Sequence, residues 1–162
     1  AFVSISPLFS VPILEERLDH PVDEIELLCQ QERLKDPQGS KVSNVGGWHS
    51  GNINYPDSPF FFLSDIGTIC QEFCKDVLKI NKPIRLINAW VNINQKFNSN
   101  QAHTHPGCVL SGVYYIKTPK ECGNIQFQHP ALPPVRQTYL PCIAKQETLQ
   151  GQRLGHVYYF VS

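Results

Sequence analysis

HTHPGCVLSGVYYI, residues 103–116, joins two histidines to an apolar run that is rich in β-branched and aromatic residues. Such a run is typical of a β-strand, and we expect one over residues 109–117. Residues two apart on an extended backbone point to the same side, so His103 and His105 can direct both imidazoles at one point. A proline and a glycine then end the extended stretch. The sequence therefore predicts two adjacent imidazoles at a strand edge, placed as ligands of one metal ion.

The histidine pair by itself does not name a metal. Imidazole nitrogen suits iron, zinc, copper and nickel alike. A second interpretation needs no metal, because one histidine could be a solvated surface residue while the other hydrogen-bonds a loop. The context favours ligation: an extended segment that contains Trp90 and Asn92 precedes the pair, and an apolar strand with two tyrosines follows it.

Further strands are expected on both sides of this stretch. Residues 84–94 (IRLINAWVNIN) alternate apolar and polar side chains. Residues 124–127 (NIQF) and 156–161 (HVYYFV) are two shorter candidate strands. Residues 2–15 also alternate, but two prolines interrupt them, which is typical of an edge strand with breaks.

Two helices are predicted in the first half of the chain. The second covers residues 63–79, and the first begins at Asp19 and Pro21 and places four apolar residues near helical spacing: Ile25, Leu28, Cys29 and Leu34. Residues 36–58 are rich in Gly, Asn, Ser and Pro and are predicted to form a long surface loop. Helices followed by strands favour an α+β arrangement, or a β-sandwich braced by N-terminal helices.

Length and composition restrict the class of protein. The chain has 162 residues, of which 41% are hydrophobic and 17% charged, as in an ordinary globular domain. Basic and acidic residues number 14 each, so a nucleic-acid partner is not expected. No apolar run approaches the roughly 20 residues of a membrane span. Six scattered cysteines without a CxxC pair are expected to be reduced packing residues, which favours a cytoplasmic location.

Several short motifs, in order along the chain, resemble one family. They are Leu8-Phe9 followed by VPI, SNVGGWHS at 43–50, AWVNIN at 89–94, HTHPGCVLSGVYYI at 103–116 and GNIQF at 123–127. Together they resemble a family of bacterial and phage 2-oxoglutarate- and iron(II)-dependent oxygenases, relatives of the prolyl 4-hydroxylases. The resemblance implies a mainly β, single domain over residues 1–162. Its fold would be a double-stranded β-helix, a cupin-like jelly-roll, braced by the N-terminal helices.

The resemblance also implies a cofactor site, with iron(II) and 2-oxoglutarate at the mouth of the sandwich. His103 falls on the histidine of the HxD motif of related hydroxylases, and His105 stands where the aspartate would be. Tyr115 falls where prolyl hydroxylases use a tyrosine hydroxyl to hold the distal carboxylate of 2-oxoglutarate. Asn92, on the same strand face as Trp90, is a candidate contact to the cosubstrate or to metal-bound water, and the alternative is an asparagine that only ends a strand ladder.

The C-terminal part departs from the family pattern. The family requires a third ligand late in the fold, and His156 is in roughly the right order. However, the expected series of Gly, an apolar strand, Phe-Pro-Ser, His and then Arg is absent, Arg153 precedes His156, and the chain stops at Ser162. A truncated or frame-shifted terminus would explain this departure.

Three functions therefore stay open. The first is an oxygenase that uses 2-oxoglutarate as its cosubstrate and hydroxylates a protein, a peptide or a small molecule. The second is a jelly-roll that binds a metal or ligand without turnover because it lacks the distal ligand. The third is a cupin-like zinc or nickel enzyme that does not use 2-oxoglutarate. We expect neither a nucleic acid nor a membrane among the partners, and we expect the chain to form a homodimer.

Overall fold

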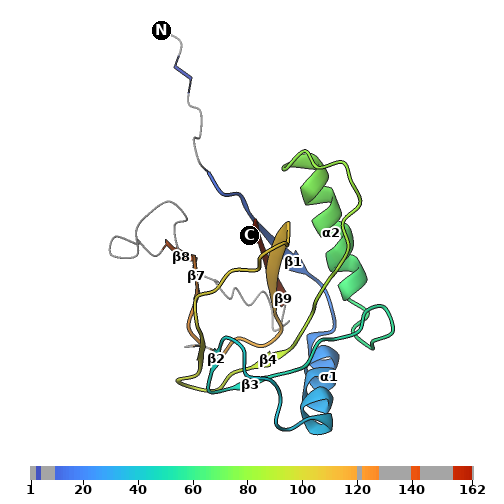
Figure 1. Cartoon of the computed structure of the whole chain (residues 1–162), viewed down its shortest axis with the longest axis vertical. Coiled ribbons are helices and arrows are strands. Elements are labelled where there is room, and N and C mark those ends of the chain that lie inside the picture. The colour runs from blue at the N-terminus through green and yellow to red at the C-terminus, as the bar shows by residue number, and fades with distance from the viewer. Residues whose placement is uncertain (1–2, 5–9, 120–121, 128–139, 143–154, 162) are drawn as a thin grey trace.

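The computed structural model describes residues 3–4, 10–119, 122–127, 140–142 and 155–161 (Figure 1). The largest sheet that these residues form has three strands in the order β1-β9-β6, and both strand pairs are antiparallel. The three strands are β1 (Ile13–Leu18), β6 (Leu110–Tyr115) and β9 (Gly155–Val161). Strand β9, from the end of the chain, therefore lies between two strands from its beginning and its middle.

Helix α1, Val22–Lys35, follows β1 after a short turn. Two acidic residues lie in its first turn and two basic residues in its last, which is the charge distribution that the helix dipole favours. Its buried residues Val22, Ile25 and Cys29 are three and four apart and therefore form one apolar face. Leu34, which the sequence predicted to belong to this face, is 79% exposed, so that prediction is wrong.

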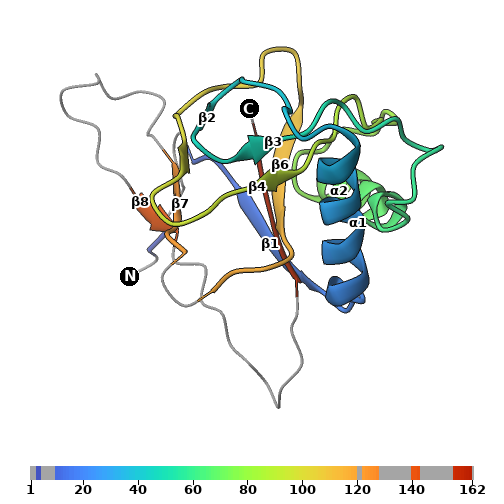
Figure 2. The same cartoon turned by 90° about the horizontal axis from the view of Figure 1, so that it is seen from below.

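Helix α2, Leu63–Asp76, is strongly amphipathic and buries four residues, Leu63, Cys70, Phe73 and Cys74. Figures 1 and 2 show both helices on the same side of the β1-β9-β6 sheet. Apolar side chains of β1 and β6 pack against Cys70, namely Leu14, Leu18, Leu110 and Tyr114. The burial of Cys70 and Cys74 confirms that these cysteines are packing residues. The five cysteines whose side chains are described form no disulfide with one another.

Three two-stranded sheets complete the described part of the chain. Strand β2 (Asn44–Val45) pairs with β5 (Ser99–Asn100), and β3 (Trp48–His49) pairs with β4 (Asn92–Ile93). Strand β7 (Ile125–Phe127) pairs with β8 (Leu140–Cys142). The turn between β2 and β3 requires glycine, because Gly46 and Gly47 have φ angles of 67° and 65°. A Cβ on either glycine would also clash with the side chain of Asn98 or Asn94 at 2.2 Å.

The main hydrophobic core joins α1, α2 and the β3-β4 pair. Its buried members are Ile25, Cys29, Trp48, Phe60, Phe62, Leu63 and Val91. Burial of each large apolar side chain contributes roughly 1.5–3 kcal/mol to stability. Tyr114 and Ile116 pack against this core, which couples it to the three-stranded sheet.

Both predicted helices and the predicted strands at 109–117, 124–127 and 156–161 are confirmed, with shifts of a few residues at their ends. The predicted edge strand at 2–15 is confirmed only near its end, as β1, and residues 1–2 and 5–9 lie outside the described residues.

The predicted loop at 36–58 is wrong in part, because it contains β2 and β3 and buries Trp48, His49 and Ser50. The predicted strand at 84–94 is reduced to the two residues of β4. Before β4, side chains replace strand partners: Ile84 donates its N–H to Gln71 Oε1, Ala89 to Asn52 Oδ1 and Val91 to Ser50 Oγ. Two backbone bonds, from Ser50 N–H to the carbonyl oxygen of Val91 and from Ile53 N–H to that of Ala89, join these side-chain bonds in fastening the segment to residues 50–53.

The described residues thus form a mixed arrangement of helices and small sheets. The more specific double-stranded β-helix stays a prediction from the family resemblance. In the described part of the chain, no helix has the length and apolar character that crossing a membrane requires.

Candidate metal site

The segment that carries His103 and His105 begins at a rigid turn. Within this turn Asn98 Oδ1 accepts the N–H of Gln95 at 2.8 Å, and Asn98 donates its own N–H to the carbonyl oxygen of Gln95 at 3.0 Å. Such bonds are the reason that asparagine is frequent in turns. At the end of β5, Gln101 donates its N–H to the carbonyl oxygen of Ser43 at 2.8 Å. The loop is therefore fastened to the 43–49 segment immediately before the two histidines.

His103 and His105 lie side by side, as predicted from their spacing. Their ring centroids are 4.8 Å apart and the ring planes meet at 64°. His103 Nδ1 lies 2.7 Å from the carbonyl oxygen of Gln101, and because a carbonyl can only accept, Nδ1 carries the hydrogen. In the neutral ring Nε2 then has a free lone pair. This is the arrangement that orients a metal-binding histidine through its other nitrogen.

Two further rings extend the pair into a row. The indole of Trp90 stacks on His105 with centroids 5.7 Å apart and planes 23° apart. The same indole stacks on His49 at 5.5 Å and 14°. His49 is buried, and its Nδ1–H donates to the carbonyl oxygen of Ser50 at 2.6 Å. We call His49, Trp90, His105 and His103 the ring row.

The electrostatics of the pair favour a neutral His105. Burial lowers the pKa of His105, and the neighbouring His103 lowers it further because a second positive charge would be repelled. Metal binding requires the neutral imidazole, so this shift keeps the ring in its ligating form to lower pH than an ordinary histidine.

The donor set fits an iron(II) ion in part. The two imidazoles supply two of the three protein ligands that non-haem iron oxygenases use. Among the residues that the structure describes, no group of three or more His, Cys, Asp or Glu side chains is close enough to hold a metal ion. His49 therefore does not complete the site with the pair, although it belongs to the same ring row.

The other predicted site residues lie on strands around this loop. Asn92 is exposed and lies opposite His49 in the β3-β4 ladder. Tyr115 ends β6 and is half-buried, and the antiparallel register places it opposite His156 of β9. The side chain of His156 lies outside the described residues.

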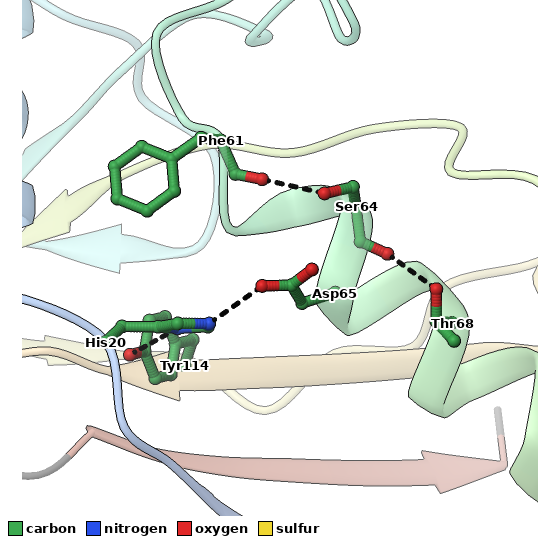
Figure 3. Close-up of polar contacts among 6 residues, drawn as sticks. All are labelled: His20, Phe61, Ser64, Asp65, Thr68 and Tyr114. Carbon is green, nitrogen blue, oxygen red and sulfur yellow. Dashed lines mark hydrogen bonds and ion pairs between the residues drawn. The ribbon is translucent and has the colours of Figure 1, made fainter.

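A second histidine cluster, which the sequence did not predict, joins three elements. His20, between β1 and α1, lies with its Nδ1 3.0 Å from the hydroxyl of Tyr114 and its Nε2 3.2 Å from Oδ2 of Asp65 on α2 (Figure 3). A carboxylate accepts, so Nε2 carries a hydrogen, and in the neutral ring Nδ1 accepts from the tyrosine. Phe62 packs against both aromatic rings. We call His20, Asp65 and Tyr114 the His20 cluster.

The sequence carried only weak signals for these additional residues. Trp90 and His49 lie in the motifs AWVNIN and SNVGGWHS, but their stacking depends on the β3-β4 register. His20 and Tyr114 are 94 positions apart, so no local pattern connects them.

Residues 88–158 match the family model described as "Putative 2OG-Fe(II) oxygenase". The match begins just before Trp90, contains the histidine pair, β6 and β7, and ends within β9. Over this segment the chain is similar to the 2-oxoglutarate- and iron(II)-dependent oxygenase family, which confirms the resemblance of the motifs at 89–94, 103–116 and 123–127. Searches of curated proteins and of solved structures find no match.

The family match supports an oxygenase-like enzyme domain that uses iron(II) and 2-oxoglutarate. When bound, iron(II) and 2-oxoglutarate would supply the O₂-dependent oxidation of a C–H bond, and His103 and His105 are the described residues that would hold the metal. The chemistry belongs to the metal and the cosubstrate, while the protein binds and orients them.

Proposed function

We propose that the chain is a non-haem iron(II)- and 2-oxoglutarate-dependent dioxygenase that hydroxylates a protein, a peptide or a small molecule. The observation that carries the proposal is the geometry of His103 and His105. The two rings are adjacent, and the Nδ1–H bond of His103 to Gln101 leaves its Nε2 available to a cation. This pair lies inside the segment that matches the oxygenase family.

In this proposal, His103 and His105 hold the metal. The bond to the Gln101 carbonyl fixes the tautomer and the ring orientation of His103, so that little reorganisation is needed on binding. Since the pKa of His105 is lowered, its ring requires no deprotonation near neutral pH. The hydrogen bond thus prepares the orientation of His103, and the lowered pKa prepares the neutral form of His105.

His156 is the proposed third ligand. Its support is the backbone register, which places residue 156 opposite Tyr115 on the neighbouring strand. The family match also extends past this position, to residue 158.

Tyr115 and Asn92 are the proposed contacts to 2-oxoglutarate. A phenol hydroxyl can donate to the distal carboxylate of the cosubstrate, and the amide of Asn92 can donate to a carboxylate or to metal-bound water. Tyr115 alternates along β6 with Tyr114, whose side chain contacts the helix core, and Asn92 is exposed. Tyr115 and Asn92 therefore do not share the core-facing position of Tyr114.

The test is anaerobic addition of iron(II) and 2-oxoglutarate to the protein, followed by visible absorption spectroscopy. Wild type should show the weak charge-transfer band of a chelated cosubstrate, and His103→Ala should not. Thr104→Ala is the matched control, because Thr104 is exposed between the two histidines and should leave the band unchanged. Absence of the band in wild type would contradict the proposal.

A non-catalytic metal- or ligand-binding module is the second candidate. The observation in its favour is the departure of residues 153–162 from the family pattern, since the series of Gly, an apolar strand, Phe-Pro-Ser, His and then Arg is absent. Release of succinate separates the two functions: the dioxygenase converts 2-oxoglutarate to succinate in the presence of O₂ and substrate, whereas the module binds iron(II) without producing succinate.

A further inference from the structure

Trp90 connects a buried histidine to a proposed ligand. Its indole stacks on His49 and on His105 in nearly parallel planes, 14° and 23° apart. An imidazole on a loop is ordinarily free to turn about its terminal torsion, which has a broad energy profile. A flat partner restricts that rotation because stacking requires the two planes to stay close to parallel.

The position of Trp90 is itself fixed by contacts of its segment with His49 and Ser50. In the β3-β4 ladder, His49 lies opposite Asn92, and Trp90 lies two residues before Asn92, just outside β4, on the diagonal from His49. Aromatic side chains can reach each other across this diagonal. Two hydrogen bonds of 2.9 Å continue the connection, from Ser50 N–H to the carbonyl oxygen of Val91 and from Val91 N–H to Ser50 Oγ.

His49 is held at both its backbone and its ring. Only 7% of the residue is exposed, and its Nδ1–H donates to the carbonyl oxygen of Ser50. The ring row therefore has a rigid end at His49 and an open end at His103, which is exposed. Trp90, 36% exposed, lies between these two environments.

We propose that Trp90, held by His49, is a positioning residue that sets the ring plane of His105 for metal binding. The inference rests on the proposed function, because it takes His103 and His105 as the ligands. It goes further by assigning a role to two residues that do not touch the metal. Since an orienting partner of a ligand is worth about 10- to 100-fold in metal affinity, its loss is measurable.

The experiment measures Co²⁺ affinity by calorimetry, because Co²⁺ replaces iron(II) and is stable in air. Trp90→Ala should bind Co²⁺ about tenfold more weakly than wild type. Trp90→Phe should recover most of the affinity, because a benzene ring can still stack on His105. Equal affinity in Trp90→Ala and wild type would overturn the proposal. So would a loss in Trp90→Phe as large as in Trp90→Ala.

Tryptophan fluorescence supplies an independent measurement. The chain has two tryptophans, and only Trp90 belongs to the ring row. Co²⁺ at His105 should quench the Trp90 emission in wild type, whereas Trp90→Phe, with Trp48 alone, should keep its emission. Unchanged wild-type emission at saturating Co²⁺ would contradict the placement. Circular dichroism verifies folding, and Trp90→Leu replaces Trp90→Ala if the alanine variant does not fold.

Failure of this inference and failure of the proposed function give different results. If wild type does not bind Co²⁺, or binds it equally well after His103→Ala, the ligand assignment fails and the positioning role with it. If His103→Ala abolishes binding but Trp90→Ala does not weaken it, the ligands stand and only the role of Trp90 is rejected.

Discussion

The two histidine clusters of this chain use the same side chain in opposite ways. In the His20 cluster both ring nitrogens have partners, on β6 and α2, and only 11% of the His20 side chain is exposed (Figure 3). In the histidine pair, the described hydrogen bond of His103 engages Nδ1 alone, and the residue is exposed. A histidine with two protein partners connects elements, whereas one with a single partner keeps a nitrogen available for a ligand.

The largest expected effect separates the two clusters by metal affinity. His105→Ala should weaken Co²⁺ binding by about 100-fold or more, since a ligand contributes at least as much as its orienting partner. His105→Asp should bind more tightly than His105→Ala, because a carboxylate can also coordinate the ion. Calorimetric titration measures both. His20→Ala is the control and should bind Co²⁺ like wild type. A loss of affinity in His20→Ala as large as in His105→Ala would contradict the assignment of metal binding to the histidine pair alone.

The second expected effect concerns stability. His20→Ala should lower the free energy of unfolding by about 2 kcal/mol, because it removes two hydrogen bonds and leaves the half-buried hydroxyl of Tyr114 without its partner. Urea denaturation followed by circular dichroism measures this loss. His103→Ala, at an exposed position, should change the stability by less than about 0.5 kcal/mol. Equal losses in the two variants would contradict the division into structural and ligand histidines.

Within the His20 cluster, the two partners should contribute unequally. Tyr114→Phe should cost about 1 kcal/mol of unfolding free energy, because the lost hydrogen bond is partly buried. Asp65→Asn should cost less than about 0.5 kcal/mol, because its side chain is 63% exposed and water screens its interaction with His20. The same denaturation experiment ranks the two variants, and the opposite ranking would show that the contact with Asp65 contributes more than the one with Tyr114.

A further expected effect, confined to alkaline solution, is a pH dependence of stability. Burial raises the pKa of Tyr114 from 10.0 to about 12. Between these values the folded protein keeps the phenol proton while the unfolded chain releases it. The stabilisation is therefore fully present below pH 10 and is lost as the pH rises toward 12. Denaturation of wild type and Tyr114→Phe across this range measures the difference, and parallel curves would contradict it.

The sequence predicted what depends on local spacing. The adjacency of His103 and His105 follows from residues two apart on extended backbone, and the helix faces follow from apolar residues three and four apart. The prediction failed for Leu34, which lies in the last turn of α1 beyond the core that the helix contacts. The spacing of apolar residues predicts which face of a helix is buried, but it does not predict where along the helix the packing partner ends.

The sequence could not predict contacts that depend on register. Trp90 stacks on His49 because β3 and β4 pair as Trp48 to Ile93 and His49 to Asn92, and a slip of one residue would turn these side chains to opposite faces. Residues 84–91 have the alternation of a strand, yet side chains such as Ser50 occupy their backbone groups. The proposed ligand set is similarly non-local, because residue 156 comes near the other site residues only through the pairing of β9 with β6.

The place of β9 between β1 and β6 has a consequence for the order of events during synthesis. Both ladders of the three-stranded sheet run through residues 155–161, so neither can form until the ribosome has released that segment. Until then β1 and β6 each present an unpaired edge, and such edges promote association between nascent chains. Closure of this sheet is a long-range step, and we expect it to limit the folding rate.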